Sequence, residues 1–282
     1  VTFHDKSKCK ALLVRFDEDK DIAVLHVPKK NLRPLSHGDS SKLQHGDKVT
    51  AISNLYGMYP SSCTDGIISF VGRDVDVEPI GQKSQKFIQT NAASTKGSSG
   101  GALVNQFGEL IGMITRVQKT FSDASGGVAF AIPLDRVVDV VHQLLSNDGK
   151  VERPFLGILY GGRELRVKME KLGMKGVAFK DAPKEGPAGR KKLVPTSYIR
   201  GGKELKLGDI ITSVNGKEVT NGLDLIRILE NCKIDEEVTL EMTSGSSKKR
   251  KRRPNKKTVH VKLESKSKLE ETAGRKWGAN YI

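Results

Sequence analysis

A serine followed directly by two glycines is the residue of this sequence best suited to chemistry. Ser99 precedes Gly100 and Gly101, follows the turn-like stretch 95–98 and comes before the apolar run 110–115. Backbone N–H groups of such a turn can point at one spot beside the hydroxyl. Acyl transfer requires this arrangement, because the charge that develops on the substrate carbonyl oxygen must meet prepared donors. The turn predicts a nucleophilic serine, although Gly/Ser clusters also form ordinary loops.

Two further segments carry a family resemblance together with this turn. The segment 17–25 resembles the one that contains the triad aspartate of HtrA/Deg serine proteases. The turn around Ser99 resembles their nucleophile loop, with Ser98 where the family has Asn, and 207–216 resembles the signature of a PDZ domain. The order and spacing of the three features match that family. The segments most similar to its chloroplast members in plants are 181–183, 186–189 and 223–229.

The resemblance implies a mainly β protein with a chymotrypsin-like double β-barrel, the first barrel truncated at its N-terminus, followed by a PDZ domain. We expect the protease domain at 1–149, the PDZ domain at 150–265 with a basic insert at 246–257, and a C-terminal tail at 266–282. Local patterns agree with this division. Short strand-like runs predict β-structure, and they lie at 11–16, 21–27, 48–53, 66–71, 86–90 and 128–132. Apolar residues at helical spacing predict a helix over 134–145.

The family resemblance also assigns roles to the residues of the site. Ser99 would attack the scissile carbonyl, and Asp21 would orient a histidine that accepts the serine proton. The backbone N–H groups of Gly97 and Ser99, with Ser98 as a third candidate, would form the oxyanion hole. The loop 115–127 would line the pocket for the substrate side chain. These residues imply hydrolysis of a peptide bond through an acyl-enzyme.

The histidine of the triad is missing from this assignment. In the family it precedes the aspartate and stands before a valine at a strand end, and residue 1 already lies beyond that point. None of the histidines fits the role: His4, His26, His37, His45, His142 and His260. We therefore expect this chain to be inactive alone, either as a piece of a longer protein or as a protein that lost its opening strands. The first is favoured, because lost strands would leave barrel edges unpaired.

Departures from the family motif keep a non-catalytic alternative open. Asn91 replaces the usual Asp, and Lys96 replaces the usual Pro before Gly97. The segment 53–55 reads Ser-Asn-Leu where the family has Gly-Asn-Pro. The alternative is a pseudo-protease that acts as a PDZ peptide-binding or chaperone-like protein.

A second candidate site lies at the start of the expected PDZ domain. Phe155, Leu156, Gly157 and Ile158 occupy the place of the loop that receives a peptide carboxyl terminus. Free backbone N–H groups capture the carboxylate there, and the peptide extends the neighbouring sheet. A helix expected over 221–231 would form the other wall of the groove.

Charge suggests a third function class. The net charge is +15, but eight of the ten residues 248–257 are Lys or Arg, which leaves +7 for the remainder. Such a run repels itself and predicts a solvated loop. It could also be a nuclear targeting signal or contact nucleic acid or an anionic membrane, and any nucleic-acid contact would be confined to it. No aromatic residue interrupts the run, so base stacking is excluded there.

Composition and the lack of certain motifs limit the remaining classes of protein function. The three cysteines are scattered without metal-ligand spacing, which predicts free, buried thiols. We expect no cofactor and no metal, since the sequence has neither a zinc motif nor a glycine-rich phosphate loop. No apolar run approaches the length of a membrane span. Resemblance implies homotrimers or hexamers of the full-length protein, damaged or unfolded substrates, and a chloroplast location at the thylakoid or in its lumen, with the nucleus as the alternative.

Overall fold

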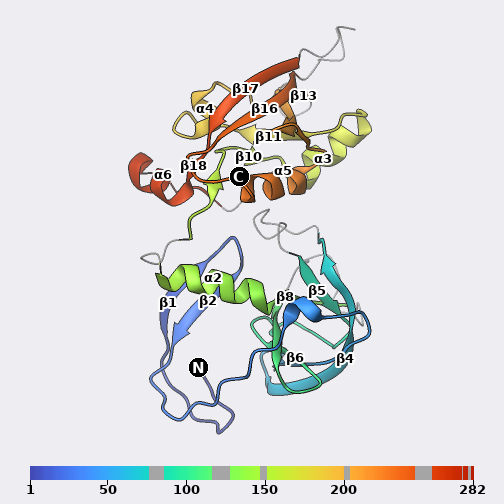
Figure 1. Cartoon of the computed structure of the whole chain (residues 1–282), viewed down its shortest axis with the longest axis vertical. Helices are drawn as coiled ribbons and strands as arrows, with labels where there is room; N and C mark the ends of the chain where they lie inside the picture. Colours follow the sequence, from blue (N-terminus) through green and yellow to red (C-terminus); the bar gives the residue numbers. More distant parts are fainter. Residues whose placement is uncertain are drawn as a thin grey trace. The chain divides into compact units, whose positions relative to one another are not determined.

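The computed structural model describes residues 1–75, 86–115, 128–146, 151–199, 204–244, 256–274, 276–278 and 281–282 (Figure 1). The described residues form two compact units, and the division falls between Val151 and Glu152. The expected boundary after residue 149 lies outside the described residues. The chain is mainly β, as predicted.

Six strands of the first unit close into a barrel, in the order β3-β4-β5-β8-β7-β6. Side chains alternate along them, so that Val49 and Ala51 of β3 point inward while Lys48 stays exposed. Ile68, Leu103 and other fully buried residues fill the interior. The strands are β3 (Lys48–Leu55), β4 (Tyr59–Arg73), β5 (Phe87–Thr90), β6 (Ala102–Asn105), β7 (Leu110–Thr115) and β8 (Ala129–Pro133).

A separate hairpin precedes the barrel along the chain. It is formed by the part of the sequence in which the truncated first barrel was expected. Among the described residues, its strands β1 (Leu12–Asp17) and β2 (Ile22–His26) pair only with each other. Helix α2 (Leu134–Ser146) confirms the helix predicted from spacing and runs alongside the hairpin (Figure 1). Ile22 of the hairpin and Leu144 of the helix share one buried cluster. A short 3-10 helix, η1 (Ser40–Lys42), is joined to the start of α2 by a hydrogen bond of 2.9 Å from Ser40 Oγ to Asp135 Oδ1.

The second unit is built on a sheet with the strand order β10-β11-β14-β16-β17, to which β15 (Lys217–Glu218) is added beside β14. Its core joins both sheet and helices, with Phe179, Ile211, Leu225, Val238 and Leu240 almost fully buried. The other sheet strands are β10 (Leu159–Tyr160), β11 (Val177–Asp181), β14 (Asp209–Val214), β16 (Glu237–Ser244) and β17 (Lys256–Lys262). Two small pairs flank the sheet: β12 (Ser197–Ile199) with β13 (Glu204–Lys206), and β9 (Pro154–Phe155) with β18 (Glu264–Ser265).

Four helices complete this unit: α3 (Gly162–Lys171), α4 (Pro187–Arg190), α5 (Gly222–Glu230) and α6 (Lys266–Ala273). Helix α5 confirms the prediction over 221–231. Its N-cap is Asn221, whose side-chain oxygen accepts from Leu223 N–H at 2.9 Å and Asp224 N–H at 3.1 Å. Its buried face carries Leu225 and Leu229.

Candidate active site and peptide groove

The turn with the candidate nucleophile connects β5 to β6. Ser99 is exposed, whereas the preceding Ser98 is only 1% exposed. Gly97 has a φ of 96°, and a Cβ there would lie 2.5 Å from Gly57 N and 2.7 Å from Asn54 O. No other residue type fits without moving that neighbouring backbone, because a real Cβ does not approach backbone atoms so closely. The chain is thereby forced into a sharp bend that presents Ser99 to solvent.

Strand β7 holds the far side of the turn. Gly100 N–H donates to Ile114 O at 2.8 Å, and Ile114 N–H donates to Gly101 O at 2.8 Å. Gly101 N–H also donates back to Ser98 O at 3.0 Å. Main-chain hydrogen bonds therefore fix the backbone on either side of Ser99.

The backbone N–H groups around Ser99 differ in whether they already donate a hydrogen bond within the protein. Ser98 N–H donates to Thr95 O at 3.0 Å and is committed within the turn. Among the described residues, no acceptor is found for the N–H groups of Gly97 or Ser99. Of the three amides considered for an oxyanion hole, Gly97 and Ser99 are thus available in this conformation and Ser98 is not.

The Ser98 side chain braces the turn from inside. Its Oγ accepts from Thr95 N–H at 3.1 Å and from the Ser53 hydroxyl of β3 at 3.2 Å. Asn91, another position that departs from the family motif, is exposed, but its Oδ1 also accepts a backbone hydrogen bond, from Ile67 N–H at 2.7 Å. Both substituted positions therefore make internal hydrogen bonds that fix the backbone.

Asp21 reaches the same end of β7 from the hairpin. It lies directly before β2 with a φ of 58°, and its Oδ2 accepts a hydrogen bond from Thr115 Oγ1 at 3.0 Å. Thr115 follows Ile114, which holds the Ser99 turn. Two consecutive residues of β7 thus connect the candidate aspartate and the candidate nucleophile. Sequence reasoning missed Thr115, because a threonine at a strand end is ordinary and its contact spans 94 residues.

All six histidines lie in described parts of the chain. No hydrogen bond joins any of them to Ser99 or Asp21 within those parts. His26 is exposed at the end of β2, and the His45 ring packs on Phe70 with centroids 5.0 Å apart. The expected substrate-pocket loop is described only at Thr115, since 116–127 lie outside the described residues.

The predicted carboxylate-binding loop lies between β9 and β10. Gly157 has a φ of 80°, a conformation in which a side chain would be strained. The N–H groups of Leu156, Gly157 and Ile158 all donate to one atom, the main-chain oxygen of Ile282, at 3.2, 2.7 and 3.2 Å. Phe155 is buried beside them. The loop therefore gathers three donors on one oxygen, which is the geometry expected of a carboxylate receptor.

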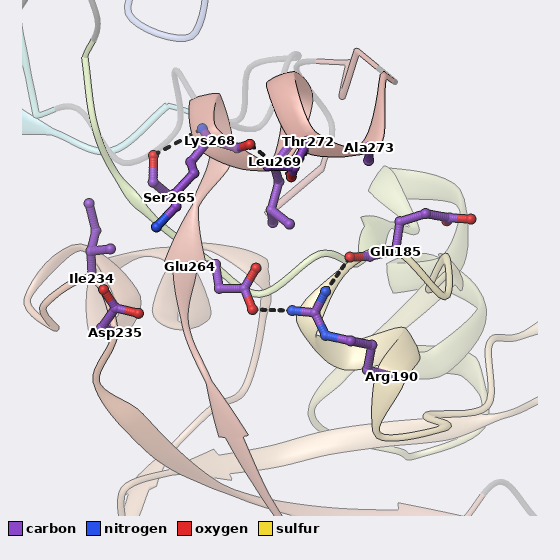
Figure 2. A pocket seen from close by; sticks show the side chains of 10 residues that line it. All are labelled: Glu185, Arg190, Ile234, Asp235, Glu264, Ser265, Lys268, Leu269, Thr272 and Ala273. Carbon is purple, nitrogen blue, oxygen red and sulfur yellow. Dashed lines mark hydrogen bonds and ion pairs between the residues drawn. The ribbon is translucent and has the colours of Figure 1, made fainter.

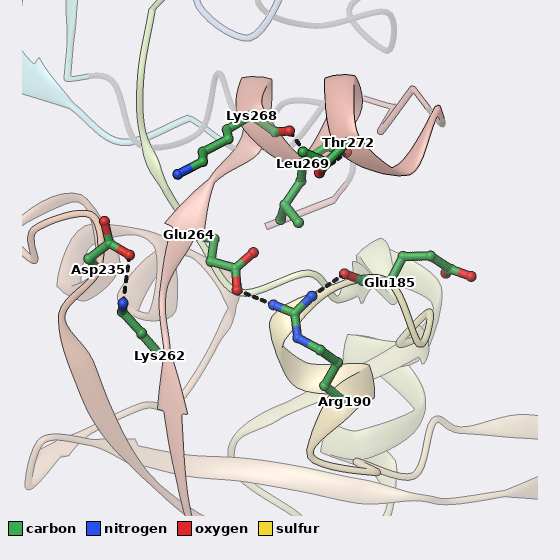
Figure 3. A network of polar contacts seen from close by, with 8 residues as sticks. All are labelled: Glu185, Arg190, Asp235, Lys262, Glu264, Lys268, Leu269 and Thr272. Atoms are coloured by element: carbon green, nitrogen blue, oxygen red, sulfur yellow. Dashed lines mark hydrogen bonds and ion pairs between the residues drawn. The ribbon is translucent and has the colours of Figure 1, made fainter.

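A cavity of about 500 Å³ lies between α6, β18 and the segment around α4 (Figure 2). Arg190 on its wall pairs with Glu264 and donates to Glu185 O at 2.5 Å, and nearby Lys262 pairs with Asp235 at 2.9 Å (Figure 3). These contacts leave opposite charges neutralising one another, so the cavity has no evident preference for a charged ligand. We assign it no chemistry.

The parts of the chain that the structure describes contain neither a metal-binding cluster nor a membrane-spanning helix. No group of three or more His, Cys, Asp or Glu side chains in those parts could hold a metal ion. No helix there is both long and apolar enough to span a bilayer. Cys9, Cys63 and Cys232 are free, as predicted, but the expected burial is wrong, because Cys63 is exposed and the other two are half-buried.

Comparison with known proteins agrees with both halves of this description. Residues 1–113 match the trypsin-like peptidase domain, and residues 197–268 match the PDZ domain. The chain is 45% identical over 252 residues to "Protease Do-like 1, chloroplastic" of Arabidopsis thaliana, an alignment that covers 89% of this chain and 56% of the relative. It is 34% identical over 256 residues to "Serine protease Do-like HtrB" of Bacillus subtilis, covering 86% and 52%.

Solved structures agree with the sequence relatives. The structure described as HtrA-type protease AlgW with decapeptide superposes with a TM-score of 0.66 at 29% identity, covering 94% of this chain and 74% of that one. The chain spans about half the length of the two curated relatives named above. With a trypsin-like peptidase domain followed by a PDZ domain, and Do-like proteases as its relatives, the chain belongs to the HtrA/Deg family of serine proteases.

Proposed function

We propose that the protein is an ATP-independent serine endopeptidase that degrades damaged or unfolded proteins, with a PDZ domain that binds peptide carboxyl termini. The observation that carries the proposal is the turn at Ser99. An exposed hydroxyl stands beside two unused amides, on a turn fixed by the same strand that contacts Asp21. An ordinary Gly/Ser loop has no reason to combine these features.

In the proposed mechanism, Ser99 Oγ attacks the scissile carbonyl while a histidine supplied from outside this chain accepts its proton. Asp21 orients that histidine and stabilises its charged form, and the Thr115 hydroxyl holds the carboxylate in place. The N–H groups of Gly97 and Ser99 receive the oxyanion. Losing one such donor typically raises the barrier by about 3–4 kcal/mol.

The first prediction concerns activity. The 282-residue chain alone is expected not to cleave unfolded casein, because a triad works as a unit. Joining the native upstream segment with its histidine should restore cleavage, and Ser99→Ala in that extended protein should abolish it. Ser36→Ala, which changes an exposed serine elsewhere in the same unit, is the matched control and should leave cleavage intact. Equal cleavage with alanine at position 99 would show that the site is misassigned.

A second candidate function is a pseudo-protease that works through its PDZ groove or as a chaperone. The observation in its favour is the fully formed donor loop at 156–158, which needs no triad. The upstream coding sequence separates the two candidates. A histidine before a valine at a strand end supports the protease, and its absence supports the binding protein.

Assembly and location are further parts of the proposal. Trimers or hexamers of the full-length protein would form through N-terminal segments outside this chain. The proposed location is the chloroplast, on the thylakoid or in its lumen, and the name of the chloroplastic relative supports the chloroplast alone. Imaging of the fluorescently tagged full-length protein tests this, and accumulation in the nucleus would favour the targeting role of the basic run instead.

Nucleic-acid binding remains a separate candidate that rests on residues 248–257. Of these, 248–255 lie outside the described residues. Lys256 begins β17, and Lys257 pairs with Asp209 at 3.3 Å. Binding to duplex DNA that weakens steeply with salt and disappears when 248–255 are deleted would support this role.

A further inference from the structure

We infer that Ser53, on β3, is a positioning residue of the candidate active site. Through the Ser98 hydroxyl it holds the turn whose Gly97 and Ser99 amides receive the oxyanion. The inference rests on the proposed endopeptidase function and deepens it. It adds to the site a residue that the family resemblance does not assign, since the family has glycine at this position.

The end of β3 forms the inner wall of the turn. A Cβ at Gly97 would lie 2.7 Å from Asn54 O. A Cβ at Gly101 would lie 2.7 Å from the Cβ of Ser53. Both glycines therefore let the turn lie against β3 more closely than side chains would allow. Ser53 and Ser98 are only 7% and 1% exposed, so water competes little for the hydrogen bond of 3.2 Å between their hydroxyls.

Anchoring residue 98 orients the amide of the candidate nucleophile. The peptide group between Ser98 and Ser99 is planar and trans, so its C=O and N–H point in opposite directions. Ser98 O accepts from Gly101 N–H at 3.0 Å, and the Ser99 N–H therefore points away from Gly101. The Ser98 hydroxyl accepts from Thr95 N–H at 3.1 Å as well as from Ser53. Residue 98 is thus held through both its backbone and its side chain, and a shift of this residue would turn the Ser99 amide.

The second oxyanion donor depends on the same contact. Gly97 lies directly before Ser98, whose N–H donates to Thr95 O at 3.0 Å. Thr95 and Ser98 are therefore joined by two hydrogen bonds that run in opposite directions, and Gly97 lies within the short ring that these bonds close. The Ser53 hydroxyl ties this ring to the barrel. One hydroxyl on β3 thus acts on both amides.

Two departures from the family motif are on this view a single compensated change. Ser53 stands where the family has Gly, and Ser98 stands where it has Asn. Position 98 loses as many side-chain heavy atoms as position 53 gains, and packed interiors tolerate volume-conserving changes best. Position 98 also keeps a side-chain oxygen that can accept hydrogen bonds. The two departures therefore favour a turn kept for catalysis over the relaxed turn of a pseudo-protease.

The test separates catalysis from binding in the extended protein, which carries the native upstream segment with its histidine. Ser53→Ala keeps the Cβ near Gly101 but removes the hydroxyl. We expect kcat for fluorescently labelled casein to fall roughly tenfold while KM is unchanged, because the oxyanion forms only in the transition state. The pH dependence of activity should stay the same, because Asp21 and the histidine are not altered.

Two further variants separate positioning from a general effect on the barrel. Ser53→Thr keeps the hydroxyl and should restore kcat. Thr50→Val is the matched control, because it removes from the other face of the same strand a hydroxyl that donates to Asp65 Oδ1 at 2.7 Å. It should leave both kcat and KM unchanged. If Thr50→Val lowers kcat as much as Ser53→Ala does, the effect belongs to the strand and the inference fails.

The residue pair of the family gives a test by gain of activity. Ser53→Gly and Ser98→Asn should each lower kcat, because the first opens a gap and the second overfills a buried site. The double variant restores the family pair and should regain most of the lost kcat through coupling between the two positions. If the two losses simply add, the inference is wrong, and this result decides the matter even where Ser53→Ala does not fold.

Failure of the inference and failure of the proposed function give different results. If the unaltered extended protein does not cleave casein, the endopeptidase function fails and the inference fails with it. If that protein cleaves casein through Ser99 and the folded Ser53→Ala variant has the same kcat, the function stands and only the inference is lost.

Discussion

Two adjacent serines in the turn before β6 have opposite environments. Ser98 is buried and its hydroxyl is hydrogen-bonded to Ser53 and Thr95, whereas Ser99 is exposed and its hydroxyl makes no hydrogen bond within the described residues. The sequence pattern identifies Ser99 as the candidate nucleophile. It does not show whether Ser98 has a structural role or takes part in catalysis. That distinction depends on Ser53, which is 45 residues away.

Replacing each serine with alanine should therefore have different consequences for folding. Ser98→Ala leaves the buried Ser53 hydroxyl and the Thr95 amide without their acceptor, so we expect the free energy of unfolding to fall by about 1–3 kcal/mol. Ser99→Ala removes no internal contact, and its effect should stay within about 0.5 kcal/mol. Urea denaturation of both variants measures the difference. A larger loss for Ser99→Ala would mean that Ser99 is the bracing residue.

At the scale of the elements, strong local patterns predicted their structures well. The helical spacing of Val137, Val141 and Leu144 predicted α2, and the short strand-like run at 48–53 predicted the strand that the structure shows as β3. Helices α3 and α6 were missed. In α3 only Leu165 and Met169 are buried apolar residues, and charged residues surround them. In α6 the capping residues Ser265 and Gly274 are standard signals for helix ends, and they could have identified it.

Helix α3 carries an exposed ion pair that changes the titration of one carboxyl, and its contribution to stability is small because water screens it. The side-chain hydrogen bond from Lys168 to Glu164, at 2.8 Å, is the main reason that the pKa of Glu164 falls to about 2, and the Tyr198 hydroxyl adds to it. The usual value is 4.5. Because the folded pKa is the lower one, the stabilisation is present above about pH 4.5 and is lost as the pH falls toward 2.

Removing the partner should restore the ordinary titration of Glu164. Lys168→Met is expected to raise the pKa of Glu164 toward 4.5, and Lys171→Met, on the same helix, is expected to leave it unchanged. The side-chain carboxyl carbon of Glu164 can be followed by NMR between pH 2 and about 6. If the pKa of Glu164 were the same in the two variants, the hydrogen bond with Lys168 could not be its cause.

The whole molecule consists of two units with separate cores. Leu103 is fully buried in the barrel, and Leu240 is fully buried in the PDZ sheet, and they belong to different clusters. The single tryptophan, Trp277, lies in the PDZ unit, so its fluorescence reports on that unit. No local pattern predicted that the tail containing it folds back to the donor loop, because those contacts join residues more than a hundred positions apart along the chain.

Separate cores predict separate unfolding. Leu240→Ala should destabilise the PDZ unit by about 2–5 kcal/mol and shift the urea transition seen by tryptophan fluorescence. Leu103→Ala removes a comparable side chain from the barrel and should leave that transition in place while shifting a second transition in circular dichroism. Equal shifts of the fluorescence transition in both variants would indicate that the units unfold as one.

The β1–β2 hairpin also has a practical consequence for the molecule in solution. Leu12, Leu13, Phe16 and Leu25 are between 50% and 66% exposed on a ribbon whose strands pair only with each other. Apolar side chains beside open strand edges invite another chain to add on. Concentrated preparations of the purified chain should accordingly become turbid on storage, and a lysine in place of Phe16 should keep them clear.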